Sequence, residues 1–363
     1  MALFSPIQIG GLNLANRIII PPMCQYSAQN GQANQWHNIH YGNLAFSGAG
    51  LLIVEATAIV PEGRISPYDL GLWGEETQIP LSRMVKAIRN YSPMLMAVQL
   101  GHAGRKASVG KPWEGDKTLT PAEGGWQPVA PSALPYKPDD PAPRELATSE
   151  LDDLIEAFIE SSQRADKAGF DAIELHCAHG YLLHEFLSPI TNKRSDEYGG
   201  SLENRMRLPL EVFTGIRALF PLDKPIGVRV SGSDWVEGGW DLESTIIFAN
   251  ELAKLGCAYI HVSGGGLSLE QKLALGPGYQ TAMAEKIKAA TGLPTIAVGM
   301  ITQAEQAEHI LVSGQADMVA IGRAMLYNPR WPWHAAAELG ARVDAPPQYW
   351  RSQPRTYKDL FTA

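Results

Sequence analysis

Cysteine is scarce in this chain of 363 residues. The three cysteines, Cys24, Cys177 and Cys257, lie far apart, and none belongs to a Cys-x-x-Cys pair. Thiols this scattered do not build a disulfide framework, and zinc and iron–sulfur sites usually draw on closely spaced cysteine ligands. The sequence therefore argues against a disulfide-stabilised scaffold and gives no support to a cysteine-held metal centre.

Excess positive charge and long apolar runs are also missing. The formal net charge is −8, which argues against a nucleic-acid partner because phosphate binding usually needs a basic face. No apolar run approaches the roughly 20 residues of a membrane-spanning helix, and the first residues lack the charged-then-apolar pattern of a signal peptide. We therefore expect a cytoplasmic protein, and a hydrophobic content of 45% suffices for a sizeable core.

The chain does contain eight short apolar segments, with helical periodicity in stretches between them. Several of those stretches begin at Ser, Thr or Asp and end at Gly, as helices do. No Gly-x-Gly-x-x-Gly motif follows the first segment, so the alternation predicts an α/β fold, a closed (β/α)8 TIM barrel, rather than an open doubly wound sheet. The predicted strands are 17–23, 51–57, 94–100, 171–176, 225–230, 258–263, 294–299 and 317–322, and the clearest helical stretches are 37–50, 149–169, 241–256 and 302–314.

Three further segments complete what we interpret as a single domain over residues 1–363. Residues 9–17 read as a β-hairpin that plugs the bottom of the barrel. Residues 101–148 form a Pro-, Gly- and Trp-rich insertion after the third strand, and a loop this long in a compact domain is usually functional. Residues 341–363 follow the last helix as an extended tail.

The most informative stretch is 171-DAIELHCAHGYLLHEFLSPITNKRSDEYGGSLENR-205. It contains a strand that ends in His176, with His179 three residues later and Tyr181 two residues after that. Active sites of such barrels lie at the C-terminal ends of the strands. A single His or Tyr there is more often a satisfied polar group than a catalyst. The three together favour a site in which two imidazoles hold a substrate oxygen and the tyrosine donates a proton.

The last two strands end in 299-GMIT-302 and 322-GR-323. Glycines at these positions let backbone N–H groups and a helix N-terminus approach a phosphate, and Arg323 adds a guanidinium that suits one. The alternative is that these glycines only permit tight turns. From the residues alone, both interpretations stand.

Other polar residues also fall at strand positions near the barrel mouth. Arg229 lies inside an apolar strand, so it needs an anionic partner, either a bound ligand or a buried Glu55 or Glu174. Gln99 and His102 end the third strand. After the first strand, Cys24 and Tyr26 are expected on one face of an extended segment, where the cysteine is either a small hydrophobic residue or a reactive group.

Together these motifs resemble the old yellow enzyme family of FMN-dependent ene reductases. More narrowly, they resemble its bacterial thermophilic-like class, which includes xenobiotic reductases. The match runs from Phe4 to about Arg351 and rests on 21-PPMCQYS-27, 52-LIVEATAIVPEGRIS-66, 99-QLGHAGRKA-107, 174-ELHCAHGYLLHEFLSPITNKRSDEYGG-200, 228-VRVSGSDW-235, 298-VGMIT-302 and 321-IGRAMLYNPRWP-332.

The resemblance implies non-covalent FMN, with NADPH or alternatively NADH as the reductant. It implies that the phosphate is held by Gly299, Gly322 and Arg323. The flavin ring would lie against Pro21, Pro22, Met23, Cys24, Ala56, Gln99 and Arg229.

For catalysis, the resemblance implies ping-pong reduction of activated C=C bonds in enones and maleimides, with nitro compounds and nitrate esters as further acceptors. His176 and His179 would hold the substrate carbonyl, and Tyr181 would donate the proton. Tyr26 would contact the substrate. Cys24 would adjust the reduction potential of the flavin.

The resemblance also implies an assembly. In this class a tail like 347-PQYWR-351 reaches a neighbouring subunit, so Arg351 would bind substrate in the partner's site of a homodimer or tetramer. Three rival interpretations remain. A related iron–sulfur flavoenzyme would need the cysteines that the chain lacks, and a non-catalytic binder of phosphate ligands would need only the glycine loops. A metal-dependent barrel hydrolase would use some of His37, His40, His102, His176 and His179.

Overall fold

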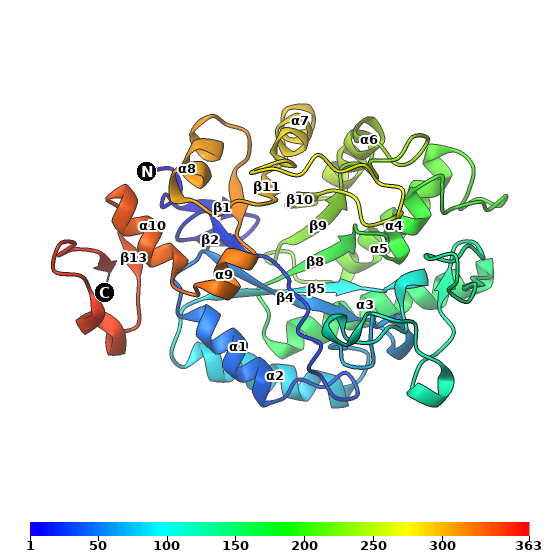
Figure 1. Ribbon diagram of the computed structural model, residues 1–363, viewed down its shortest axis with the longest axis horizontal. Helices are drawn as coiled ribbons and strands as arrows, with labels where there is room; N and C mark the ends of the chain where they lie inside the picture. Colours follow the sequence, from blue (N-terminus) through cyan, green and yellow to red (C-terminus); the bar gives the residue numbers. More distant parts are fainter. Residues whose placement is uncertain (363) are drawn as a thin grey trace.

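The computed structural model describes residues 1–362. Over this range eight parallel strands close into a barrel, and helices cover its outer surface (Figure 1). The prediction of a (β/α)8 barrel is confirmed, and each apolar segment forms one strand. In barrel order these are β3 (Ile18–Ile20), β4 (Leu51–Ala58), β5 (Leu95–Gly101), β8 (Ala172–Cys177), β9 (Ile226–Ser231), β10 (Tyr259–Ser263), β11 (Thr295–Val298) and β12 (Met318–Ala320).

The first barrel strand is shorter than expected. β3 ends at Ile20, where the prediction extended to Met23. Pro21 and Pro22 follow, and a proline has no N–H to donate to a neighbouring strand. The chain therefore leaves the sheet at this point and runs along the barrel mouth.

The helices follow the expected signals at several ends. Asp241 caps α6 by accepting the N–H of Ser244, and α3 ends at Gly169 with φ 92°. The helix expected over 37–50 runs instead from 35 to 45. The helices are α1 (Gln35–Ala45), α2 (Glu75–Arg89), α3 (Leu151–Ala168), α4 (Leu182–Leu187), α5 (Leu202–Leu219), α6 (Leu242–Lys254), α7 (Thr281–Thr291), α8 (Ala304–Val312), α9 (Arg323–Tyr327) and α10 (Trp331–Leu339).

The barrel interior is apolar at the bottom and polar at the top. The lower layer is one buried cluster that includes Ile53, Ala97, Ala172 and Tyr259. Side chains two residues further along a strand point to the same face, which puts Gln99, Glu174 and His261 in the next layer. On β4 a bulge between Val54 and Ala56 interrupts this alternation, so that Ala56 pairs with Gln99 while Glu55 binds Tyr41 of α1. A barrel built in this way has a buried, apolar floor and a polar mouth.

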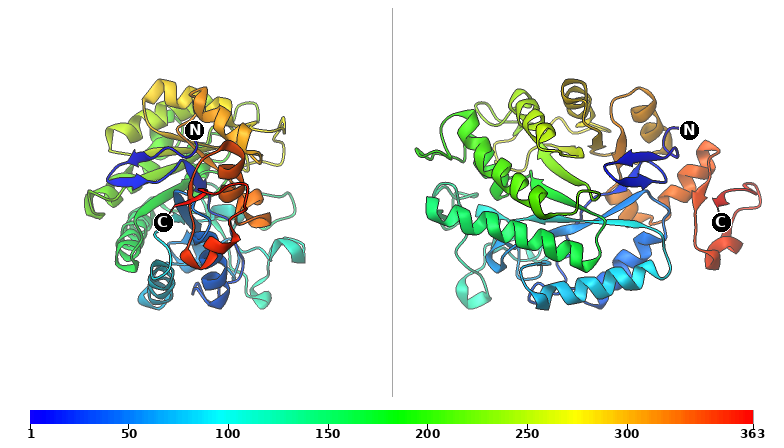
Figure 2. Two further views of the ribbon diagram at one scale, coloured as in Figure 1. Left: turned by 90° about the vertical axis from the view of Figure 1, so that its left-hand side faces the viewer. Right: turned by 180° about the vertical axis from the view of Figure 1, so that it is seen from behind.

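A hairpin of β1 (Ile7–Ile9) and β2 (Leu12–Leu14) covers the bottom of the barrel. Its Ile9 and Leu14 belong to the same buried cluster as the lower layer of the barrel. The hairpin lies at one end of the barrel and the long loop after β5 at the other (Figures 1 and 2). That loop contains short 3-10 turns and the strand pair β6 (Val129–Ala130) and β7 (Arg144–Glu145).

The C-terminal tail differs from the expected extended segment. It folds back on itself, because β13 (Val343–Asp344) pairs with β14 (Phe361–Thr362). Trp333 on α10 provides the surface for this fold. Its ring centroid lies 5.9 Å from that of Tyr349 and 4.8 Å from that of Phe361. The tail lies beside the hairpin end of the barrel (Figure 2). No helix in the described part of the chain is both long and apolar enough to cross a membrane.

Candidate active site

Strand β8 brings three aromatic side chains together at the barrel mouth. The ring centroid of His176 lies 5.2 Å from that of His179 and 4.8 Å from that of Tyr181. In both pairs the rings are nearly perpendicular, at 86°. The structure thus assembles the three residues that the sequence singled out.

The turn after β8 has an uncommon backbone conformation. His179 has φ 60° and Gly180 has φ 73°, so two successive residues adopt the left-handed region. A non-glycine residue there is strained and persists only when its surroundings hold it. The His179 N–H donates to Ser231 Oγ (3.0 Å), its Nε2 lies 2.7 Å from Ser263 Oγ, and the Gly180 N–H donates to His184 Nδ1 (2.9 Å).

Burial sets the charge state of these groups. It lowers the pKa of both His176 and His179 well below the usual value, with the positive charge of Arg229 as the next cause. Both imidazoles are therefore neutral near pH 7, and a neutral imidazole can still donate one N–H. Burial also raises the pKa of Tyr181 well above its usual range, so its hydroxyl stays protonated.

Beside this cluster lies a cavity of about 870 Å³. Two arginines line it, Arg229 from β9 and Arg323 from the start of α9. Neither forms an ion pair within residues 1–362, and the buried Nε of Arg229 has no hydrogen-bond partner there. The predicted site residues that line this cavity are Pro21, Pro22, Met23, Arg229, Gly299, Gly322 and Arg323.

The alternative of a buried ion pair for Arg229 is wrong. The Glu174 carboxylate is bound by other side chains: it accepts a hydrogen bond from Gln99 Nε2 at 2.8 Å and lies 2.8 Å from His261 Nδ1. Glu55 accepts the Gln25 N–H and the Tyr41 hydroxyl, at 2.8 and 2.9 Å. Arg229 thus faces the cavity without a carboxylate bound to it, which suits an anionic ligand.

The remaining predicted residues lie around the same mouth. Ala56 lines a small cavity together with His176 and Tyr181. Tyr26 and Tyr181 line a cavity of about 160 Å³ beneath the long loop. The segment is not extended at Tyr26 as expected, because its φ is 49°. Loss of solvent contact, then the charges of Asp69 and Glu55, raises the pKa of Cys24, so this residue is a thiol.

Comparisons with known proteins agree with this geometry. The profile of the NADH:flavin oxidoreductase / NADH oxidase family matches residues 2–341. An NADPH dehydrogenase of Geobacillus thermodenitrificans is 42% identical over 351 residues, which cover 96% of this chain and 98% of that protein. This chain belongs to that family, the old yellow enzymes.

Solved structures of old yellow enzymes have the same fold. Morphinone reductase superimposes with a TM-score of 0.77 at 30% identity, covering 99% of this chain and 96% of that one. The old yellow enzyme homologue from Zymomonas mobilis has a TM-score of 0.77 at 27% identity and covers 100% of both chains. The chain is therefore an FMN-dependent NADPH oxidoreductase of the old yellow enzyme type.

The large cavity fits the cofactor of an old yellow enzyme. Arg229 and Arg323 supply unpaired positive charge for a phosphorylated ligand. A Cβ at Gly322 would approach the protein no closer than 3.6 Å, so a side chain there would instead enter the cavity. Gly299 has φ 126°, a conformation open to glycine alone in practice.

Several other cavity residues were not identified from the sequence. Tyr279, Gln280, Met300 and Trp331 all line it. Gln280 Nε2 donates to the Val298 carbonyl at 2.8 Å, and Trp331 Nε1 donates to Thr302 at 2.8 Å. These residues lie in loops and at the start of a helix, where the sequence has no periodic pattern that could have identified them. The left-handed φ of 52° at Met300 is visible only in the structure.

The histidines do not form a metal site. Within residues 1–362, no three His, Cys, Asp or Glu side chains gather closely enough to hold a metal ion. His37 and His40 lie on α1, outside the barrel. His102 accepts the Gly104 N–H in its own turn, at 3.0 Å. The described residues therefore offer no set of metal ligands for the alternative of a metal-dependent hydrolase.

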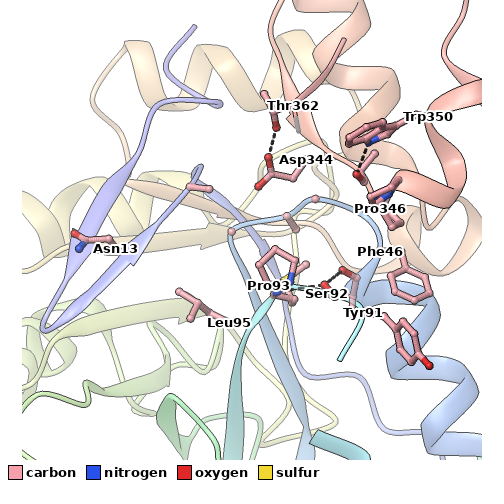
Figure 3. A pocket seen from close by; sticks show the side chains of 18 residues that line it. Asn13, Phe46, Tyr91, Ser92, Pro93, Leu95, Asp344, Pro346, Trp350 and Thr362 are labelled. Carbon is pink, nitrogen blue, oxygen red and sulfur yellow. Dashed lines mark hydrogen bonds between the residues drawn. The ribbon is translucent and has the colours of Figure 1, made fainter. Parts of the chain in front are cut away.

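A second large cavity, of about 460 Å³, lies at the opposite end of the barrel (Figure 3). It is enclosed by the starts of β4 and β5 and by tail residues that include Asp344 and Trp350. The residues that line it include no His, Cys, Lys or Arg. Arg351 is exposed on this tail and lines neither mouth cavity, so it lies away from the active site of its own chain.

Proposed function

We propose that this enzyme reduces activated C=C bonds in enones and maleimides, with nitro compounds and nitrate esters as further acceptors. The observation that carries the proposal is the cluster of His176, His179 and Tyr181 beside a cavity with two unpaired arginines. Two neutral imidazoles and one protonated phenol suit a substrate that accepts hydrogen bonds at a carbonyl oxygen and a proton at carbon.

The imidazoles of His176 and His179 bind the substrate carbonyl. Each donates an N–H to the oxygen, on which negative charge develops as the double bond is reduced. Neutral donors fixed by the fold stabilise that charge without reorganising. Ser263 Oγ, 2.7 Å from His179 Nε2, orients this ring. With the serine hydroxyl donating to Nε2, the proton of His179 lies on Nδ1 and is free for the substrate oxygen.

Tyr181 supplies the proton to the α-carbon of the substrate. Its hydroxyl is protonated across the neutral pH range, because burial and then Cys24 and Tyr26 raise its pKa. A positioned general acid typically accelerates such a step by about 10²–10⁴-fold. Tyr26 lines the 160 Å³ cavity together with Tyr181 and would contact the substrate there.

Bound FMN would carry the hydride from NADPH, with NADH as the alternative reductant, to the β-carbon of the alkene. Non-covalent binding rests on Gly299, Gly322 and Arg323 at the phosphate. Arg229 would stabilise negative charge on the flavin ring, and the Cys24 thiol would adjust its reduction potential. Pro21, Pro22, Met23, Ala56 and Gln99 would complete the walls. Because reductant and acceptor would use one site in turn, the kinetics are ping-pong.

The assembly is a homodimer, or a tetramer of such dimers, in which the tail reaches the partner's barrel. Arg351 is exposed and far from the mouth of its own barrel, so it can bind substrate only in another subunit. Tyr349, Trp350 and Arg351 are residue types that often anchor interfaces. Tyr349 and Trp350 remain 41% and 42% exposed in the single chain.

A binding titration tests the oxygen clamp. Purified protein should show flavin absorbance, and p-hydroxybenzaldehyde should add a long-wavelength charge-transfer band. Replacing both His176 and His179 with alanine should abolish the band and raise the KM for 2-cyclohexenone, while the flavin remains bound. A normal band in the double variant would refute the clamp, and a colourless protein would refute the function.

A further inference from the structure

Lys106 is a half-buried cation for which the proposed chemistry has no role. It ends the 3-10 turn η2 (Gly104–Lys106) that follows β5. Its Nζ donates to the carbonyl oxygens of His179 and Gly266, at 2.9 and 2.8 Å. An ammonium has three N–H donors, so one remains after these two bonds.

The remaining donor lies among aromatic rings. Nζ of Lys106 lies over the ring of Tyr181, 5.3 Å from its centroid, and over that of Tyr136, at 4.7 Å. Both distances are within the range of a cation–π interaction. Lys106 therefore places a positive charge directly beside the proposed proton donor.

Lys106 binds two loops at the point where their backbones approach each other closely. A Cβ built at Gly180 would come within 2.5 Å of the Gly266 carbonyl oxygen, and one built at Gly266 within 2.7 Å of the His179 Cα. The loops after β8 and β10 thus meet backbone to backbone. Lys106 binds one carbonyl from each loop, on the left-handed turn that determines the positions of His179 and Tyr181.

The surroundings of Tyr181 make a counter-charge necessary. Burial is the main cause of the raised pKa of Tyr181, and acidic groups such as Asp69 add to it, so both oppose a phenolate. A tyrosine that gives up its proton must pass through that phenolate. Burial lowers the pKa of Lys106 only to about 8, so the ammonium is its main form at pH 7.

We propose that Lys106 is a positioning residue for proton delivery: it fixes the His179–Gly180 turn and stabilises the negative charge left on Tyr181. The inference rests on the proposed function, in which Tyr181 is the donor. The phenolic O–H bond breaks as the α-carbon gains its C–H bond, and the O–H electron pair stays on oxygen. Water then returns a proton to the phenolate, while the hydride derives from NADPH.

The neighbouring Arg105 does not have this role. Its guanidinium donates to the carbonyl oxygens of Leu134, Pro135 and Leu267. It lies 5.7 Å from the Tyr136 centroid and is not found over Tyr181. Lys106 is thus the cation that both touches the turn and faces the donor.

Anaerobic stopped-flow measurements on the holoenzyme separate the two half-reactions. Lys106→Met should slow reoxidation of the reduced enzyme by 2-cyclohexenone about 100- to 300-fold, the effect of removing one charge near 5–6 Å at an effective dielectric of about 20. Reduction of the flavin by NADPH should change less than about twofold, because a hydride transfer needs no proton from Tyr181. Lys106→Arg should restore most of the lost rate.

The double variant with Tyr181→Phe distinguishes charge stabilisation from simple packing. If Lys106 acts largely through the phenolate, most of the effect of Lys106→Met should disappear once the hydroxyl is gone, and only the smaller effect on the His179–Gly180 turn should remain. Equal slowing of both half-reactions, or an undiminished effect in the Tyr181→Phe background, would overturn the inference. If Lys106→Met does not fold, Lys106→Gln, which can still donate to a carbonyl, makes the same comparison.

Two controls complete the design. Lys111→Met removes an ammonium from the same loop that lies 4.1 Å from the Tyr68 centroid, and should leave both half-reactions unchanged. A Tyr181→Phe variant that reduces the alkene at the normal rate would instead refute the proposed donor. A slow Tyr181→Phe with a normal Lys106→Met would refute only the role of Lys106.

Discussion

Replacing Arg229 with methionine should make the flavin-free protein more stable and the flavin-bound protein less able to retain its cofactor. Arg229 is 8% exposed, and its Nε is buried without a hydrogen-bond partner. An unpaired buried charge costs several kcal/mol, of which attraction to Glu174 offsets part. We expect the apoprotein to gain about 1–2 kcal/mol from a side chain of similar length without charge.

The holoenzyme should respond in the opposite direction. Arg229 would donate to the ring of oxidised FMN, and a hydrogen bond from a charged group contributes about 1.5–3 kcal/mol, so the Kd for FMN should rise by roughly 10- to 150-fold. Urea denaturation of the apoprotein gives the first quantity. Fluorescence titration with FMN gives the second.

Arg217 provides the matched control. Its guanidinium donates to the carbonyl oxygens of Phe220, Pro221 and Lys224, and it lies outside the cavity. Arg217→Met should therefore destabilise the apoprotein and leave the FMN affinity unchanged. An Arg229→Met protein with unchanged FMN affinity would show that Arg229 is a structural residue and would refute the assignment.

Three further outcomes are expected. Tyr181→Phe should slow alkene reduction by about 10²–10⁴-fold and spare flavin reduction by NADPH, as stopped-flow traces will show; a loss below tenfold would mean that water supplies the proton. Cys24→Ala should shift the flavin midpoint potential in a dye-coupled titration while activity falls but persists, and an unchanged potential would leave Cys24 as a packing residue. Truncation after Ala345 should weaken the dimer, measured by light scattering, and raise the KM for substrate. Arg351→Ala should raise the same KM and leave the assembly intact. A full-length chain that is monomeric at micromolar concentration would contradict both expectations.

The sequence by itself determined the barrel and the position of its mouth. Strand and helix periodicity are local properties, so apolar segments such as 171–176 and 225–230 identify strands without knowledge of what they contact. The strand order then places residues such as His176 at the C-terminal edge. Even the early end of β3 has a local cause, the two prolines that follow it.

Only the tertiary structure decided how these groups pair. Glu174 and Arg229 lie on adjacent strands, yet the carboxylate is bound by Gln99 and His261, and this leaves the arginine facing the cavity. The sequence allowed either arrangement, because pairing depends on distances between residues remote along the chain. The folded tail likewise depends on contact with Trp333, a residue outside it. Local pattern fixes which residues reach the mouth, and packing between distant segments fixes which of them remain free to bind a ligand.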